Sequence, residues 1–142
     1  KFIADKIGQN TTLISSARKI NNNFVNYLNN SLKKDIYKNL KNSKSKILFC
    51  GFAYKPNCPD TRNTLVYPLY KKIKKSFPNI DIYDPLVSFK DTKKEYNIKL
   101  KTKLRKKYYD SIYIIVKHKI FNKDLLKKYI KKETNIYYLH NI

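Results

Sequence analysis

Apolar residues recur at intervals of three and four along the first part of the chain, from residue 9 to residue 42. The stripe consists of Leu13, Ala17, Ile20, Phe24, Tyr27, Leu28, Leu32, Ile36 and Leu40. This spacing predicts a single long amphipathic helix, for which Asn10 or Thr11 supplies the N-terminal cap. The apolar face of such a helix has to be buried. Its partner is either the domain that follows or the same helix in a second copy of the chain.

A polar segment at residues 41–45 ends this pattern, and short apolar runs then alternate with amphipathic stretches. The runs that predict strands are Ile47–Cys50, Ile80–Tyr83, Ser111–Val116 and Asn135–Leu139. The stretches that predict helices are one beginning at Asn63 or Thr64, with the stripe Val66, Leu69, Tyr70, Ile73 and Phe77, then residues 89–96 and Asn122–Lys131. Strands that alternate with helices in this way form βαβ units and a parallel sheet.

The sequence therefore predicts an α/β fold, in which a long amphipathic helix precedes a Rossmann-like parallel sheet with flanking helices. We expect two parts: a connecting and dimerising helix at residues 1–44, and an α/β domain at residues 45–142. In open parallel sheets, ligands bind beyond the carboxyl ends of the strands. Residues 54–62 form a polar loop at that place, directly after the first strand.

The charge of the chain changes this picture only slightly. Its 142 residues carry a formal net charge of +22, which favours anionic partners. Only three of the 32 basic residues are arginines, however, and the lysines are spread in pairs over predicted helices. Proteins that read base edges rely on arginine, so solvated lysine is a simpler explanation than a nucleic-acid surface.

Composition also excludes several classes of site. Two glycines, Gly8 and Gly51, cannot form the glycine-rich turns of a dinucleotide fingerprint or a Walker A loop. Two cysteines and two histidines are too few for a disulfide framework, a cysteine-rich zinc site or a histidine-based metal site. We therefore expect no metal. No apolar run approaches the roughly 20 residues of a membrane span, so we also expect no membrane partner.

The polar loop after the first strand carries the candidate chemistry. Pro56 and Pro59 restrict its backbone, while Lys55 and Arg62 bring two cations close to a helix N-terminus. Lysine supplies a point charge, and arginine can hold a phosphate through two parallel hydrogen bonds. Asp60 either accepts backbone N–H bonds within the loop or pairs with Arg62. These residues fit an anion site, and the alternative is a charged loop that is simply solvated.

The same loop resembles a known signature. Residues 54–64, Tyr-Lys-Pro-Asn-Cys-Pro-Asp-Thr-Arg-Asn-Thr, are similar to the Y/F-K-x-x-x-x-D-x-R-x-S/T motif of the UDP-glucose/GDP-mannose dehydrogenase family. They follow a strand that ends at Gly51, as in that family. Three further stretches resemble family motifs and keep the family's order. They are Ala17–Asn21 (A-R-x-x-N), Ile82–Pro85 (V-x-x-Y-D-P), and Asp110 with His118 and Phe121 (an aspartate, then H-x-x-F).

Members of that family oxidise the C6 hydroxyl of a nucleotide sugar to a carboxylate, with two NAD⁺ and a thiol-bound intermediate. The resemblance implies an N-terminal NAD domain, a long dimerising helix and a C-terminal nucleotide-sugar domain in a cytoplasmic enzyme. This chain matches the second and third parts, which implies a homodimer through residues 10–40. The nucleophilic cysteine and the NAD fingerprint are expected upstream of Lys1, because neither Cys50 nor Cys58 matches the nucleophile. We therefore assign no catalytic residue within the chain and expect it to be inactive alone.

The resemblance also implies roles for the loop. Lys55 and the backbone around Tyr54 face the UDP-sugar, Arg62 reaches toward the NAD pyrophosphate, and Asp60 holds the loop. In many members an aspartate followed by a cation near the last strand touches the sugar nucleotide. Residues 137–141 contain no such cation, which puts that contact in doubt.

The choice of sugar follows from smaller details. Asn57–Asp60, His118–Phe121 and the pair Phe2 and Ile3 resemble the branch that acts on UDP-N-acetylhexosamines, with UDP-N-acetyl-D-mannosamine as the first choice. The alternatives are a UDP-glucose 6-dehydrogenase and, in another class, a basic α/β module that binds nucleic acid. The ordered motifs favour the dehydrogenase, and the lack of arginine clusters with interleaved aromatics weakens the nucleic-acid alternative.

Overall fold

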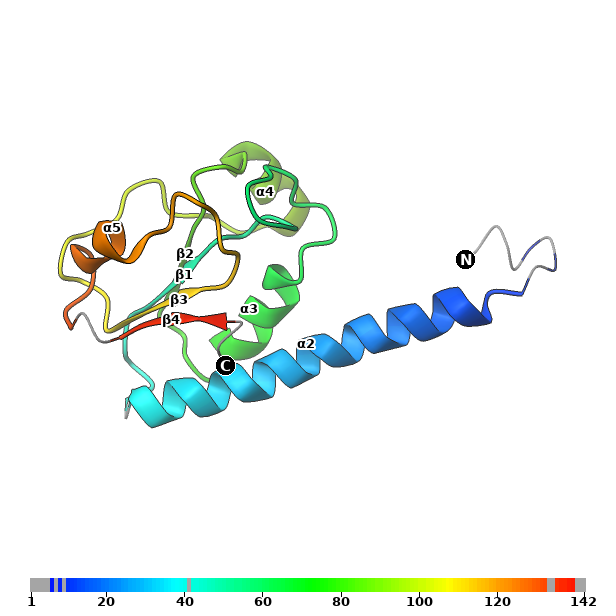
Figure 1. Cartoon of the computed structure of the whole chain (residues 1–142), viewed down its shortest axis with the longest axis horizontal. Coiled ribbons are helices and arrows are strands. Elements are labelled where there is room, and N and C mark those ends of the chain that lie inside the picture. Colours follow the sequence, from blue (N-terminus) through cyan, green and yellow to red (C-terminus); the bar gives the residue numbers. More distant parts are fainter. Residues whose placement is uncertain (1–5, 7, 9, 41, 133–134, 140–142) are drawn as a thin grey trace.

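Figure 1 shows a computed structural model of the chain, which describes residues 6, 8, 10–40, 42–132 and 135–139. The long helix α2 (Thr12–Asn39) precedes a sheet of strands β1 (Ile47–Cys50), β2 (Ile80–Tyr83), β3 (Ser111–Ile114) and β4 (Ile136–Tyr138). Between the strands lie α3 (Val66–Lys74), α4 (Phe89–Tyr96) and α5 (Lys123–Lys127). The predicted α/β fold is therefore confirmed, while the division into two parts after residue 44 stays a prediction.

The sheet is parallel throughout and has the strand order β2-β1-β3-β4. Strand β1 lies between β2 and β3, with Ile47 opposite both Ile80 and Ser111. From β1 the chain crosses over through α3 to β2 on one side, whereas β3 connects through α5 to β4 on the other side. The strand order thus reverses between β1 and β3, and this is the point at which open α/β sheets bind ligands.

Both faces of the sheet are buried, which explains the unbroken apolar runs of β1 and β3. Phe49 and Tyr113 point to one face, where they pack with the apolar sides of α2 and α3. Leu48, Ile112 and Ile114 point to the other face and pack with residues of α5 and the segments beside it. Every residue of the predicted α3 stripe is buried.

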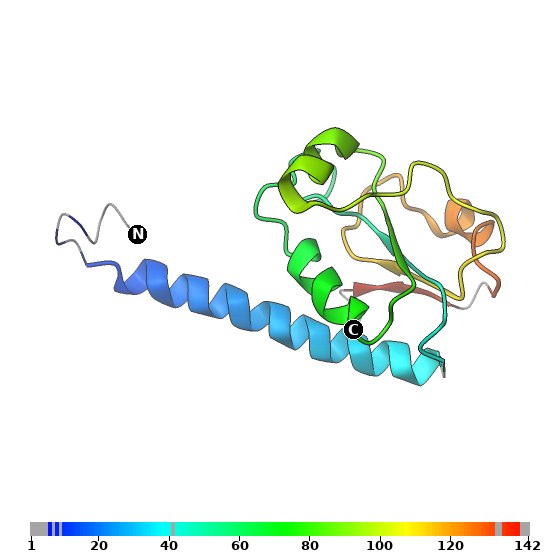
Figure 2. The same ribbon diagram turned by 180° about the vertical axis from the view of Figure 1, so that it is seen from behind.

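Helix α2 has buried residues only from its middle, at Val25, onward. Leu32 and Ile36 are fully buried, and the Tyr113 hydroxyl donates a 2.8 Å hydrogen bond to Asp35 Oδ2. In the first half, Leu13 is 83% and Ile20 69% exposed. Figures 1 and 2 show this half projecting beyond the sheet. The following domain is thus the partner of half the predicted stripe, and within the described residues nothing covers the rest.

Several predicted elements are shorter in the structure, among them the long helix, which spans Thr12–Asn39, and the last strand, which spans Ile136–Tyr138. Two others are shortened by backbone hydrogen bonds to neighbouring segments. The segment predicted as helix to Lys131 leaves α5 at Lys127, because Ile130 forms a parallel bridge with Tyr109 and Lys131 N–H donates to the Tyr109 carbonyl. The strand predicted to Val116 ends at Ile114. Here the backbone N–H groups of residues 115 and 116 both turn to the Cys50 carbonyl, at 2.9 and 3.3 Å.

Gly51 is the residue that permits this close approach of the segments that follow β1 and β3. Its φ is +91°, and a Cβ atom there would lie 2.6 Å from both the Cβ and the carbonyl oxygen of Val116. Only glycine combines this backbone conformation with a neighbour so near. The exits of β1 and β3 can therefore lie against each other at the carboxyl edge of the sheet.

We expect Gly51→Ala to lower the free energy of unfolding by at least about 2 kcal/mol, because left-handed strain and overpacking add. Gly8→Ala is the matched control, since Gly8 also has a positive φ of 70° but no atom within 4 Å of the added Cβ. Urea denaturation followed by circular dichroism measures both. Equal, small losses in the two variants would contradict the steric argument.

Candidate functional site

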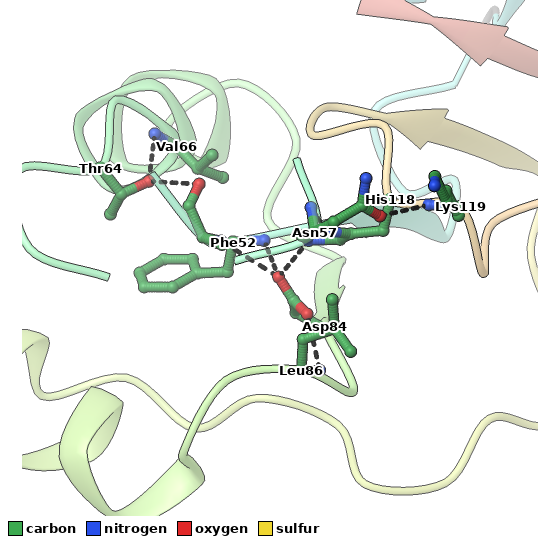
Figure 3. A network of polar contacts seen from close by, with 9 residues as sticks. Phe52, Asn57, Thr64, Val66, Asp84, Leu86, His118 and Lys119 are labelled. Carbon is green, nitrogen blue, oxygen red and sulfur yellow. Dashed lines mark hydrogen bonds and ion pairs between the residues drawn. The ribbon is translucent and has the colours of Figure 1, made fainter. Parts of the chain in front are cut away.

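The polar loop after β1 lies at the carboxyl edge of the sheet, beside the segments that follow β2 and β3. Asp84 follows β2 directly, and His118 lies four residues beyond the end of β3. Both side chains are fully buried. Figure 3 shows them meeting each other and the loop.

The Asp84 carboxylate is the centre of this arrangement. Its Oδ2 atom accepts hydrogen bonds from the N–H groups of Phe52 at 2.6 Å and Ala53 at 3.0 Å. The Oδ1 atom accepts from the N–H of Leu86 at 3.0 Å. His118 Nε2 lies 2.9 Å from Oδ2. A buried charge is tolerated only when its acceptor sites are filled, and these contacts fill them.

The partners of His118 define which ring nitrogen carries the proton. Its Nδ1 atom lies 2.8 Å from the backbone nitrogen of Asn57, which can only donate. Nδ1 is therefore the acceptor, and Nε2 carries the hydrogen that it donates to Asp84. Sequence reasoning placed Asp84 and His118 in separate motifs and missed their contact. The available signal was that each follows a predicted buried strand.

Further contacts hold the loop on either side of Asn57. The Tyr54 N–H donates to the Asp60 carbonyl at 2.7 Å, which closes the loop on itself. The Tyr96 hydroxyl, from α4, donates to the Thr61 carbonyl at 2.6 Å. Burial, the largest cause, raises the pKa of Tyr96 to about 12, so this donor keeps its proton at neutral pH. The loop is thus attached to α4 as well as to the ends of β2 and β3.

Asp60 and Arg62 form a two-point ion pair. Arg62 donates from Nε to Oδ1 at 3.0 Å and from a terminal nitrogen to Oδ2 at 2.8 Å, and its backbone N–H donates to Oδ1 at 2.9 Å. The structure therefore contains both contacts that the sequence offered as alternatives for Asp60. The Arg62 side chain is 80% exposed, so its outer edge faces solvent.

Tyr54 and Lys55 are exposed on the same loop. Tyr54 borders a groove of about 700 Å³ between the loop and the first half of α2. The groove is lined by Arg18, Asn21, Asn22, Tyr54, Asn63, Thr64 and Leu65. Two motifs far apart in the sequence, one on the helix and one on the loop, therefore share a groove that offers a cation, amides and hydroxyls.

Other sequence candidates lie elsewhere. Asp110 is at the amino edge of the sheet, where its carboxylate accepts from the Lys46 N–H and pairs with Lys131. It is therefore distant from His118, its partner in the sequence motif. Cys50 is fully buried, and burial raises the pKa of its thiol, which makes it inert at neutral pH. Phe2, Ile3 and residues 140–142 lie outside the described residues.

Neither a cluster of metal-ligating side chains nor a membrane-spanning helix is found in the part of the chain that the structure describes. No three metal-ligating side chains there gather around one point. None of its helices is both long enough and apolar enough to cross a bilayer. The chain's two glycines, Gly8 and Gly51, lie far apart in the sequence and form no glycine-rich turn for a dinucleotide. The role of Arg62 as a cofactor contact stays a prediction.

A parallel α/β sheet with a cationic loop at its switch point defines a Rossmann-like ligand-binding domain. Residues 48–142 match the UDP binding domain of the UDP-glucose/GDP-mannose dehydrogenase family. The chain belongs to this family, which confirms the resemblance of its motifs.

Individual relatives agree with this membership. UDP-N-acetyl-D-glucosamine 6-dehydrogenase of Salmonella typhi is 34% identical over 116 residues, covering 81% of this chain and 27% of that protein. UDP-N-acetyl-D-mannosamine dehydrogenase of Methanococcus maripaludis is 33% identical over 88 residues, covering 62% of this chain and 20% of that protein. The structure of UDP-D-ManNAc dehydrogenase from Pyrococcus horikoshii matches with a TM-score of 0.65 and 25% sequence identity. The match covers 90% of this chain and 30% of that protein. The chain thus spans less than a third of each of these proteins.

The ion pair of the loop generates a prediction for acid titration. The hydrogen bonds from Arg62 lower the pKa of Asp60 to about 2, against an ordinary value of about 3.9. The stabilising pair is therefore complete above the ordinary value and is lost only as the pH falls through about 2. A ¹³C NMR titration of the Asp60 carboxyl measures this directly.

Arg62→Ala is expected to return the Asp60 pKa toward its ordinary value. Arg62→Lys keeps the charge without the two-point geometry, so its Asp60 pKa should lie in between. An Asp60 midpoint near pH 4 in the unaltered chain would show that the pair does not form in solution.

Proposed function

We propose that the chain is the C-terminal, nucleotide-sugar-binding part of an NAD-dependent UDP-sugar 6-dehydrogenase. The observation that carries the proposal is the Lys55 loop, which is anchored at the switch point of the sheet and lies within the matched residues 48–142. We further propose a UDP-N-acetylhexosamine as substrate, with UDP-N-acetyl-D-mannosamine first. Relatives named for both N-acetyl sugars support this class over UDP-glucose. The cytoplasmic location stays a prediction.

In this proposal the loop contributes positive charge, and the groove contributes hydrogen-bonding groups that surround the ligand. Lys55 gives a charge-assisted contact to the UDP-sugar, and the backbone around Tyr54 borders the same ligand. The amide and hydroxyl groups along the groove fit a sugar and a pyrimidine ring, which both present donors and acceptors. Asp60 keeps Arg62 in place through two hydrogen bonds, which leaves the outer edge of the guanidinium for a phosphate.

In this proposal, NAD binds outside the nucleotide-sugar site of this chain. NAD, when bound, supplies the hydride acceptor for oxidation of the C6 hydroxyl. The described residues do not form a dinucleotide site by themselves, since they contain no glycine-rich turn. We therefore propose that another part of the enzyme holds the cofactor and the nucleophilic cysteine, and that Arg62 contributes one contact to the pyrophosphate.

Lys55→Ala should weaken UDP binding by about 10- to 100-fold, because losing a hydrogen bond to a charged group costs about 1.5–3 kcal/mol. Isothermal titration calorimetry of the chain with UDP measures the effect. Lys128→Ala is the control, since Lys128 is also exposed but lies just beyond α5, away from the loop.

The nucleic-acid alternative makes the opposite prediction. Many lysines would then contribute small, similar and salt-dependent increments to binding of duplex DNA. Titrations with DNA at two salt concentrations test this. Equal small losses at Lys55 and Lys128, with DNA binding retained, would reject the nucleotide-sugar site.

We also propose that the chain forms a homodimer through residues 10–40. Exposed apolar side chains on α2 between residues 13 and 27 support this, among them Leu13, Ile20, Phe24 and Tyr27. Phe24 additionally borders a small apolar groove of about 200 Å³ beside α3, which a second helix could extend across. A stripe of this length has too much exposed apolar surface for a helix that stays in water.

Phe24→Asp is expected to raise the dimer dissociation constant at least tenfold, because it buries a charge in an apolar contact. Sedimentation equilibrium measures the change. Asn30→Asp introduces the same charge on the polar face of α2 and should leave the dimer intact. A chain that sediments as a monomer even at high concentration would refute the proposed interface.

A further inference from the structure

The attachment of the Lys55 loop at Asn57 is the starting point. The Asn57 N–H donates to His118 Nδ1 at 2.8 Å, and the Asn57 side-chain oxygen accepts from the Lys119 N–H at 2.8 Å. Asn57 also has a φ of +58°, a conformation that asparagine tolerates better than most residues. Two residues before it stands Lys55, and Pro56 restricts the backbone between them. The position of Lys55 therefore depends on where Asn57 is held.

The loop has few other supports near its cation. Residues 54–57 are all exposed, so apolar packing does little to fix them. By contrast, the His118 ring is fully buried and packs against Phe121 with ring centroids 5.4 Å apart. A rigid, buried acceptor thus holds an exposed segment by its backbone.

The Asp84 carboxylate extends this support to the base of the loop. It binds the N–H groups of Phe52 and Ala53, where the loop begins, and it also orients the His118 ring. Because Nε2–H donates to Asp84, Nδ1 keeps the lone pair that Asn57 needs. One carboxylate therefore fixes the start of the loop directly and its middle through the imidazole.

We infer that His118 is the positioning residue of the nucleotide-sugar site: its Nδ1 atom holds Asn57, and through it Lys55, in the conformation that binds the ligand. This inference rests on the proposed function. His118 does not touch the ligand. It reduces the ordering that the loop would otherwise undergo when a nucleotide sugar binds.

Two substitutions separate the two hydrogen bonds of the ring. In His118→Asn the side-chain oxygen takes the place of Nδ1, so the bond from Asn57 is kept and the bond to Asp84 is lost. In His118→Gln the side-chain nitrogen takes the place of Nε2, so the bond to Asp84 is kept and the loop is released. Urea denaturation gives the stability of each variant, and calorimetry gives its affinity for UDP.

His118→Asn should lose more stability than His118→Gln, since it removes a donor from the buried Asp84 carboxylate, whereas His118→Gln loses a part-buried hydrogen bond to a backbone N–H. UDP affinity should fall about tenfold in His118→Gln but stay within about twofold in His118→Asn. A merely structural role predicts instead that affinity follows stability in both. Equal affinities in the two variants would overturn the inference.

The unaltered chain supplies a second measurement that needs no variant to fold. Long-range ¹H–¹⁵N NMR should show the His118 tautomer with hydrogen on Nε2, and the Asn57 amide should exchange slowly although the residue is exposed. Hydrogen on Nδ1, or fast exchange at Asn57, would overturn the inference.

The outcomes also distinguish the inference from the proposed function. If the unaltered chain does not bind UDP, both fail. If it binds UDP and Lys55→Ala weakens binding while both His118 variants bind normally, only the positioning role is rejected.

Discussion

A buried carboxylate at the end of β2 sets the constraint that organises this domain. Removing an ionised carboxylate from water costs several kcal/mol, and the cost is offset only where hydrogen-bond donors surround it. For Asp84 these donors come from three places in the chain: the exit of β1, the turn after β2 and the segment after β3. The requirement to satisfy one carboxylate thus brings the carboxyl ends of three strands together and builds the platform on which the polar loop rests.

Much of the fold follows from local pattern because both faces of the sheet are covered. Runs such as Ile47–Cys50 admit no polar residue, and α3 and α4 have clear periodicity or capping, so these elements appear where the sequence predicts them. The pattern fails where backbone pairing competes with it. Leu125, Leu126 and Ile130 have helical spacing, yet Ile130 leaves the helix to pair with Tyr109, a contact that local sequence does not encode.

In the candidate site, too, local features could be predicted from the sequence and long-range contacts could not. Lys55, Asp60 and Arg62 lie within eight consecutive residues, so the sequence predicts their motif and the contacts open to Asp60. His118 lies 34 positions from Asp84 and 61 from Asn57, so those contacts depend on the strand order. The close approach of β1 and β3 at their carboxyl ends depends in turn on Gly51, where a side chain would clash with Val116.

The long sequence separation between the loop and His118 has a consequence for folding during synthesis on the ribosome. A ribosome adds about 5–20 residues per second, so the 61 positions between Asn57 and His118 take roughly 3–12 s to synthesise. During that interval the first strand and its loop exist without the imidazole that holds them. The Lys55 loop is therefore held at Asn57 only after residue 118 has been synthesised, and a truncated translation product that stops before residue 118 lacks this contact.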